Sequence, residues 1–309
     1  MELKSFKHTE RLMGNTFDIT VVGKDATWAN SKLLLAVNEI KRIENLLTTF
    51  SESSQTNHIN QQAGISAVKV DREVFELIER SIRISNVTDG AFDITYGSID
   101  KKLWNFDQNM TSFPNLETAK SMVRLINYKN IILNKKESMV MLKEAGMRIG
   151  FGGIGKGYAA EMAKALLIRE GVKSGIVNAS GDLTTWGNQP DGKPWTIGIV
   201  DPDHKKQPFS YLDVTNMAVA TSGNYEKFVK INGIKYSHTI NPKTGLPVTG
   251  IKSVTIISPN AEIADAMATP VTIMGISAGL NMINQINYLG CIIIDDDNRI
   301  YTSKNINLR

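Results

Sequence analysis

Hydrophobic and polar residues along this chain follow two different periods, and the first switch between them comes early. The segment NTFDITVVG, residues 15–23, alternates apolar and polar side chains, as a strand with one buried face does. In residues 27–50 the period lengthens to that of an amphipathic helix. The apolar residues that define this helical face are Leu33, Val37, Ile40, Ile43 and Leu47. A strand that leads directly into a helix is therefore predicted to open the fold.

Four more helices are predicted from the same helical period and from their end signals. The first of them spans residues 71–90 and ends on a glycine, and the next, residues 115–126, is less regular. Another follows a glycine-rich stretch and runs to Gly171, and the last begins near Glu262.

Short strands account for most of the remaining sequence. They are expected at residues 130–134, 138–143, 174–179, 195–201, 211–222, 227–233, 251–258, 290–295 and 299–303. Because helices and strands occupy separate blocks, the pattern favours an α+β fold over a doubly wound sheet, with mixed, largely antiparallel sheets flanked by helices. The sequence shows no internal repeat and no long linker, so residues 1–309 are expected to form one domain, or two closely packed lobes.

Composition narrows the class of protein only slightly. The chain has 309 residues, 42% of them hydrophobic, which is ordinary for a globular protein with a sizeable core. The net charge is +4, and the basic residues are scattered, so neither nucleic-acid nor membrane binding is indicated. A single cysteine, Cys291, lies in an apolar run and excludes an internal disulfide.

The first residues, MELKSFKHTERLMG, contain no apolar core of a signal peptide, and no later segment reaches about 18 uninterrupted apolar residues. No transmembrane segment is therefore expected. As written, the sequence predicts a cytoplasmic protein; removal of an export signal would instead make it periplasmic or membrane-associated.

The stretch IGFGGIGKGYAAE, residues 149–161, places five glycines in the eight positions from Gly150 to Gly157. Part of it matches the G-x-G-x-x-G turn of dinucleotide-binding folds, and part matches the start of a Walker A loop. The Walker A interpretation fails because Gly157 stands where a magnesium-binding hydroxyl is required. The Rossmann interpretation is weakened because the next predicted strand runs into a second loop, ASGDL, before the acidic residue Asp182 appears.

The physical property common to both motifs still holds for this stretch. Consecutive glycines ahead of a helix expose backbone N–H groups at the positive end of the helix dipole, which suits an anion such as a phosphate. The alternative is a glycine-rich turn that packs tightly under a sheet.

The segment AEIADAMATPVTIMG, residues 261–275, carries a candidate metal site. In a helix, Asp265 and Thr269 lie four positions apart and therefore on the same face. One carboxylate and one hydroxyl suit Mg²⁺, which takes few protein ligands. Asp265 could equally cap or solvate a helix start. Pro270 disfavours a helical conformation for the residue before it unless the helix bends there.

Three other polar positions are candidates for binding or catalysis. His238 lies just ahead of a turn built by Asn241, Pro242 and Gly245, and it is either a general base or a structural residue. Ser-Gly pairs beside Asp182 and Asn224, the second containing Ser222, suit hydrogen bonds to a ribose or phosphate but also suit ordinary turns.

Asp93 stands between apolar neighbours in TDGAFDITYGSI, residues 88–99. A carboxylate in such a place is either satisfied by internal hydrogen bonds or used in function.

Seven short motifs occur in a fixed order between Met13 and Thr269. They are LMGNTF, TDGAFDITYG, GGIGKGYAAE, NASGDL, ATSGNY, HTINPKTG and ADAMAT. In content and order they resemble those of the FAD:protein FMN transferases, the ApbE-like flavin transferases. The resemblance implies a T-fold-like α+β architecture with a cleft for FAD. It also implies Mg²⁺-dependent cleavage of the FAD pyrophosphate, transfer of FMN to a threonine or serine hydroxyl of an acceptor protein, and release of AMP.

The resemblance also implies roles for individual residues by motif position. His238 would be the base for the acceptor hydroxyl, and the metal would be held by the backbone carbonyl of Gly153 with Asp265 and Thr269. With Asp182 and Ser222 from the Ser-Gly turns included, the residues expected to contact FAD are Met13, Phe50, Ala91, Phe92, Asp93, Lys156, Asp182, Ser222 and Thr239.

Two positions depart from the family pattern. Phe50 stands where the family often has a tyrosine, so a hydroxyl contact is lost while ring stacking is retained. Gly150 stands where members commonly have an aspartate, which removes one polar contact with FAD. Two alternatives to the transferase therefore stay open, an FAD pyrophosphatase that yields FMN and AMP and a non-catalytic FAD-binding protein. The chain contains no SGAT-like target of its own, so an acceptor must be another protein.

Overall fold

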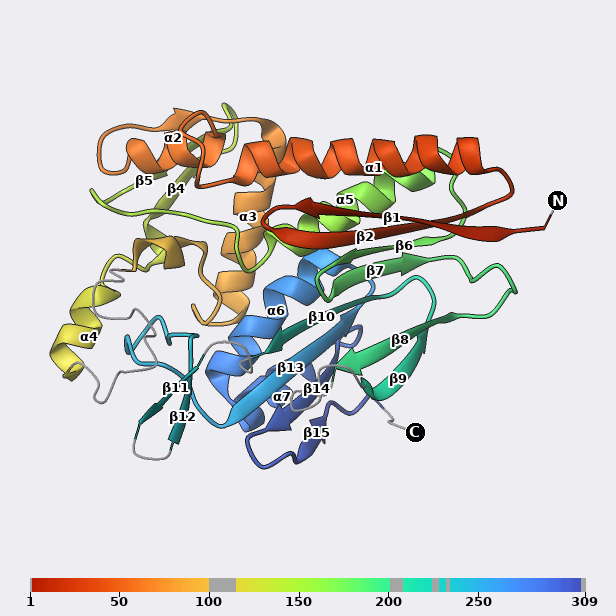
Figure 1. Ribbon diagram of the computed structural model, residues 1–309. Coiled ribbons are helices and arrows are strands. Elements are labelled where there is room, and N and C mark those ends of the chain that lie inside the picture. The colour runs from red at the N-terminus through yellow and green to blue at the C-terminus, as the bar shows by residue number, and fades with distance from the viewer. Residues whose placement is uncertain (1, 100–114, 201–207, 224–227, 232–233, 307–309) are drawn as a thin grey trace.

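The computed structural model describes residues 2–99, 115–200, 208–223, 228–231 and 234–306. Its central element is an eight-stranded sheet in which every neighbouring pair is antiparallel (Figure 1). In spatial order the strands are β1 (Lys4–Leu12), β2 (Asn15–Gly23), β6 (Gly175–Ala179), β7 (Asp182–Trp186), β10 (Ala218–Gly223), β13 (Ile251–Ser258), β14 (Gly290–Asp295) and β15 (Ile300–Thr302).

Three long helices cover one face of this sheet. They are α1 (Ala26–Leu47), α5 (Gly155–Arg169) and α6 (Ala261–Met274). Figure 1 shows α1 alongside the β1–β2 hairpin, with α5 and α6 beside the middle strands. The apolar stripe of α1 is buried, as the helical period predicts, and packs with Ile256 and Ile293 of the sheet into one core.

The opposite face of the sheet is covered by a two-stranded ribbon of β8 (Trp195–Val200) and β9 (Pro208–Val214). Ile257 and Ile292 point to this second core, whereas the adjacent Ile256 and Ile293 point to the helices. This alternation explains why β13 and β14 are buried at nearly every position, because both faces of these strands are covered.

The remaining elements form a second group beside the sheet. They are α2 (Gln55–Gln61), β3 (Val68–Lys69), α3 (Arg72–Val87), the 3₁₀ turns η1 (Ile94–Ser98) and η2 (Tyr128–Asn130), α4 (Leu116–Met122), β4 (Ile131–Asn134), β5 (Met139–Leu142), β11 (Phe228–Ile231) and β12 (Ile234–Ser237). The last helix, α7 (Ile276–Ile283), instead packs against α6 and β14. Strands β3, β5 and β4 make a small sheet, and β11 pairs with β12.

The predicted α+β class with mostly antiparallel strands is confirmed, and several boundaries need correction. The single strand expected at 211–222 is two strands, because Asn216 has a φ of 57° and turns the chain between β9 and β10. The loop expected at ASGDL is a tight turn at Ser180 and Gly181, and β7 begins directly at Asp182. Helix α1 ends at Leu47, which leaves Phe50 outside the helix.

None of the helices within the described ranges combines the length and apolar character needed to cross a membrane.

Candidate functional site

The glycine-rich stretch forms a turn that leads into α5. The carbonyl of Phe151 accepts hydrogen bonds from the amides of Ile154 (3.1 Å) and Gly155 (2.6 Å), which closes the turn. The amides of Gly152 and Gly153, by contrast, donate to none of the residues that the structure describes. Together with the N-terminus of α5, this glycine turn offers free backbone donors to an anion.

Gly157 is the point at which α5 meets α6. A Cβ atom on Gly157 would lie 2.2 Å from the carbonyl oxygen of Ala261 and 2.7 Å from Cβ of Asp265, so only glycine fits. Because the two helices approach so closely, the amide of Gly157 donates a hydrogen bond of 2.9 Å to Oδ2 of Asp265. The residue that excludes a Walker A loop is therefore the one that brings the helices together.

Asp265 is almost fully buried, with 7% of its surface exposed. Burial raises the pKa of its carboxyl to about 7, and the negative charge of Asp182 adds to this shift. Lys156 and the amides of Gly157 and Lys156 act in the opposite direction. A cation bound nearby would stabilise the ionised form of this buried carboxylate.

Lys156 and Asp182 form an ion pair next to Asp265. Asp182, at the first position of β7, is 3% exposed and also accepts from the amide of Thr221 (3.3 Å). Burial raises the pKa of Asp182 above its ordinary value, although Lys156 opposes that shift. The side chain of Lys156 is 27% exposed, so it is the member of the pair that a bound molecule can reach.

Thr269 lies one turn after Asp265 on α6 and is half-buried. Helix α6 continues through Pro270 to Met274, so Thr269 stays helical and shares a face with Asp265. The hydroxyl of Thr269 forms no hydrogen bond with the part of the chain that the structure describes.

Helix α6 presents two oxygens of the type that Mg²⁺ prefers, the carboxylate of Asp265 and the hydroxyl of Thr269, on one helix face. The Gly153 carbonyl, expected as a third ligand, belongs to the glycine turn before α5. In the described ranges no three His, Cys, Asp or Glu residues gather as a metal cluster.

Two apolar side chains lie against the glycine turn. The ring of Phe92, 5% exposed, would be 3.6 Å from a Cβ on Gly153, and Cε of Met13 would be 3.5 Å from a Cβ on Gly155. Met13 occupies the β1–β2 turn with a φ of 52°. Ala91, directly before Phe92, is also buried.

The carboxylate of Asp93 is satisfied inside the protein. Its Oδ1 accepts from the amide (2.8 Å) and hydroxyl (2.6 Å) of Thr95, and its Oδ2 accepts from the amide of Tyr128 (2.8 Å). Burial raises its pKa even so. Of the two roles that the sequence left open for this side chain, the structure shows internal satisfaction, which fixes the turn after Ala91 and Phe92.

Phe50 lies in the loop after α1, and 99% of its surface is exposed. The neighbouring Thr49 places its methyl group 3.7 Å from where a Cβ on Gly150 would be. The loop that carries the ring therefore borders the glycine turn.

His238 and Thr239 follow β12 in a loop whose backbone folds back on itself. The amide of Val248 donates to the carbonyl of Thr239 (3.0 Å), and His238 is exposed while Thr239 is buried. The amide of Ile240 donates to the hydroxyl of Tyr96 (3.3 Å), which connects this loop to the segment after Asp93.

Ser222 is half-buried on β10, one position after Thr221, whose amide binds Asp182. Asn224, the other candidate in that motif, lies outside the described residues. A cavity of about 300 Å³ joins several of the predicted segments. Its lining includes Ala91, Asn241, Lys243 and Ile273.

Glu161 was not predicted to matter, yet it ties the site's three elements together. Its Oε2 accepts from the first amide of α6, at Ala261 (2.9 Å), and from the hydroxyl of Thr184 on β7 (3.3 Å). Lys164 pairs with Glu161 (3.1 Å) and donates to Thr184 (3.1 Å). The available signal was spacing, because Glu161 lies four residues after Gly157 and thus on the same face of α5.

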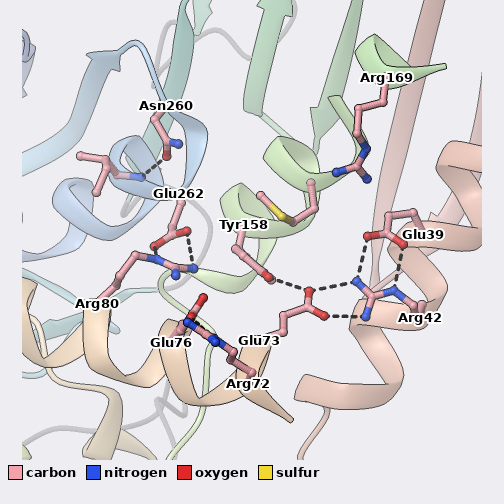
Figure 2. Close-up of a pocket in the computed structure, with 12 residues that line it drawn as sticks. Glu39, Arg42, Arg72, Glu73, Glu76, Arg80, Tyr158, Arg169, Asn260 and Glu262 are labelled. Atoms are coloured by element: carbon pink, nitrogen blue, oxygen red, sulfur yellow. Dashed lines mark hydrogen bonds and ion pairs between the residues drawn. The ribbon is translucent and has the colours of Figure 1, made fainter. Parts of the chain in front are cut away.

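A separate cavity of about 680 Å³ lies between α1, α3, α5 and α6, and no sequence-predicted site residue lines it. Figure 2 shows its charged side chains turned toward one another. Arg42 pairs with Glu73 (2.6 Å), which also accepts from the hydroxyl of Tyr158 (2.6 Å), and Arg80 pairs with Glu262 (2.6 Å). These contacts join the helices, so the cavity is explained as a polar junction of the fold.

Comparisons with known proteins give relatives of this chain by sequence and by fold. The sequence profile of the ApbE family matches residues 13–293. The FAD:protein FMN transferase of Klebsiella pneumoniae is 29% identical over 98% of this chain and 93% of its own length. The protein of the same name from Treponema pallidum is 27% identical over 98% of this chain and 88% of its own length.

Solved structures show the same fold. The ApbE protein of Thermotoga maritima superposes with a TM-score of 0.86 and 29% identity, covering 97% of each chain. The apo form of the flavinyl transferase ApbE from Pseudomonas stutzeri superposes with a TM-score of 0.84 and 24% identity, over 98% of this chain and 96% of its own.

Proposed function

The chain belongs to the ApbE family, and from that membership we propose that it is an FAD:protein FMN transferase. In the proposed reaction a threonine or serine hydroxyl of an acceptor protein attacks the FMN phosphorus of FAD. A new oxygen–phosphorus bond forms as the bond to the AMP phosphate breaks, AMP leaves with the electron pair, and the hydroxyl proton passes to a base.

The observation that carries this proposal is the junction of α5 and α6. A glycine turn with free amides leads into α5 at Lys156, and directly beside it a buried carboxylate, Asp265, accepts from Gly157. The turn and the lysine suit the diphosphate of FAD, because both attract negative charge.

The oxygens of Asp265, Thr269 and the Gly153 carbonyl would hold Mg²⁺ in this family. A bound Mg²⁺ neutralises the charge that develops on phosphate oxygens during the transfer. Lys156, which is paired with Asp182, would add a positive charge on the same side.

The other predicted residues would hold the rest of FAD. The exposed ring of Phe50 and the side chain of Met13, which lies against the glycine turn, would offer apolar surface to its ring systems. The buried Ala91–Phe92 pair would support the turn from behind, since the Phe92 ring lies against Gly153. Ser222 and Thr239 would supply hydrogen bonds, and Asp182 would act through its ion pair with Lys156, whereas Asp93 would act by fixing the turn before η1.

The test is to incubate the purified protein with FAD and Mg²⁺, with and without a protein that carries a candidate threonine or serine target. We expect covalent FMN fluorescence on the acceptor and one AMP released for each FMN attached. Rapid AMP release without acceptor would identify an FAD pyrophosphatase instead. Bound FAD that stays intact with Mg²⁺ present would identify a non-catalytic binding protein.

His238 is proposed as the base that accepts the hydroxyl proton. Replacing it with alanine is expected to slow transfer by about a hundredfold, since general-base catalysis contributes about 10²–10⁴, while FAD affinity changes little. Transfer rate and FAD affinity would be measured on the same preparation, with His8→Ala on the exposed strand β1 as the matched control. An equal loss in both quantities would make His238 a binding residue.

A further inference from the structure

The loop around Phe50 is ordered by hydrogen bonds although its aromatic ring lies in water. The amide of Phe50 donates to the hydroxyl of Thr48 (3.2 Å), and the hydroxyl of Ser54 donates to the Thr48 carbonyl (2.6 Å). Single exposed apolar side chains are common on protein surfaces, so the exposure alone carries no conclusion. The informative feature is how the backbone on each side of the ring is held.

A single buried side chain, that of Asn57, holds the backbone on both sides of Phe50. Asn57 of α2 is 8% exposed, and its Nδ2 donates to the carbonyls of Thr49 (2.9 Å) and Ser51 (2.7 Å), the two neighbours of Phe50. The Thr49 carbonyl belongs to the peptide unit that joins Thr49 to Phe50, and the Ser51 carbonyl belongs to the unit after Ser51. The two hydrogen bonds therefore hold the backbone on both sides of Phe50 and restrict the direction in which its side chain leaves the backbone.

The same helix also holds the glycine turn. Asn60, three residues after Asn57, donates to the carbonyl of Ile149 (3.0 Å) and accepts from the amide of Ile149 (2.7 Å). Ile149 directly precedes Gly150, whose Cβ position lies 3.7 Å from the methyl group of Thr49. Helix α2 therefore sets the position of the Phe50 loop relative to the glycine turn.

From this geometry we infer that Asn57 is a positioning residue that holds the Phe50 ring ready to stack on an aromatic ring of FAD. The inference rests on the proposed function and adds to it a residue that does not itself touch the ligand. Its physical basis is preorganisation, because a loop that is ordered during folding need not be ordered again when FAD binds.

A double-mutant cycle tests the inference without turnover. FAD affinity is measured by flavin fluorescence in the presence of a metal chelator for wild type, Asn57→Asp, Phe50→Ala and the double variant. Asn57→Asp keeps the shape of the side chain but removes both donors. We expect each single change to weaken binding by about tenfold, as loss of one stacking contact does, and the double variant to bind as Phe50→Ala does.

Asn60→Asp is the matched control on the same helix. This change removes the donor to the Ile149 carbonyl and keeps the acceptor for the Ile149 amide. The losses of FAD affinity caused by Asn60→Asp and by Phe50→Ala are therefore expected to multiply when the two changes are combined. Thermal unfolding establishes that each variant is folded at the assay temperature. If Asn57→Asp does not fold, Asn57→Ser, which retains one donor, is used in the same cycle.

A folded Asn57 variant that binds FAD as tightly as wild type would overturn the inference. A double variant whose loss of FAD affinity is the product of the two single losses would overturn it too. A wild-type protein that binds no FAD either with chelator or with Mg²⁺ would overturn the proposed function, and this inference with it.

Discussion

Replacing Asp265 with asparagine is expected to lower the rate of FMN transfer by about a thousandfold or more, because each tenfold corresponds to about 1.4 kcal/mol and a metal ion supplies several kcal/mol of charge stabilisation. The change removes the one carboxylate in the proposed ligand set. The measurement is AMP release together with covalent FMN on the acceptor. Near wild-type rates would refute the metal assignment.

The same variant has a stability signature that depends on pH. In the fold, the pKa of Asp265 is about 7, above the ordinary value of 3.8, so the metal-free folded state binds the proton more tightly than the unfolded state does. The free energy of unfolding therefore falls as pH rises from about 4 to above 7. Asparagine has no charge to bury, so Asp265→Asn is expected to be more stable than wild type at pH 8, by on the order of 4 kcal/mol, with the difference shrinking toward pH 5.

This stability comparison also serves as the control for activity. Denaturant unfolding at pH 8 and pH 5, with chelator present, separates loss of function from loss of fold. An Asp265→Asn protein that is inactive and clearly less stable at both pH values would indicate a structural role for the carboxylate rather than metal binding.

Gly157→Ala is expected to destabilise the protein by about 3 kcal/mol or more, the upper range for overpacking a tight contact. The added methyl group would overlap the backbone of Ala261, which cannot rotate away as a side chain could. Helices α5 and α6 would have to separate, and the hydrogen bond from Gly157 to Asp265 would lengthen. Denaturant unfolding measures the loss, and Mn²⁺ titration monitors the proposed metal site.

Gly152→Ala provides the matched control for stability. Gly152 belongs to the same glycine turn, but a Cβ there would meet no atom within 4 Å, so stability is expected to change by about 0.5 kcal/mol or less. Equal losses in the two variants would contradict the close helix contact and would point to a general need for backbone flexibility in the turn.

The sequence predicted best where one period dominates a segment. Strands β2, β13 and β14 were predicted with the boundaries that the structure shows, because alternation or a continuous apolar run marks them clearly. Strand β1 was missed because it lies at the edge of the sheet and its side chains are mostly exposed, so it has no apolar period. Helix α2 was missed because its sequence, QTNHINQ, is almost entirely polar.

For the site, residue types and motif order identified candidates, but not their pairings. The ion pair of Lys156 with Asp182 and the contact of Gly157 with Asp265 depend on the approach of α5, β7 and α6 in space. The roles of Asn57 and Glu161 are of the same kind. Asn57 and Glu161 each form hydrogen bonds with backbone atoms of another segment. Such partners leave no pattern in the local sequence.

The hydrogen bond between Gly157 and Asp265 spans 108 positions of the chain. During synthesis on the ribosome, the glycine turn therefore emerges long before the carboxylate that it meets. A nascent chain that ends before α6 contains the glycine turn proposed to bind the diphosphate, without the carboxylate proposed to hold the metal. If that carboxylate is required for the reaction, the ability to use FAD appears only after α6 has been synthesised and has packed against α5.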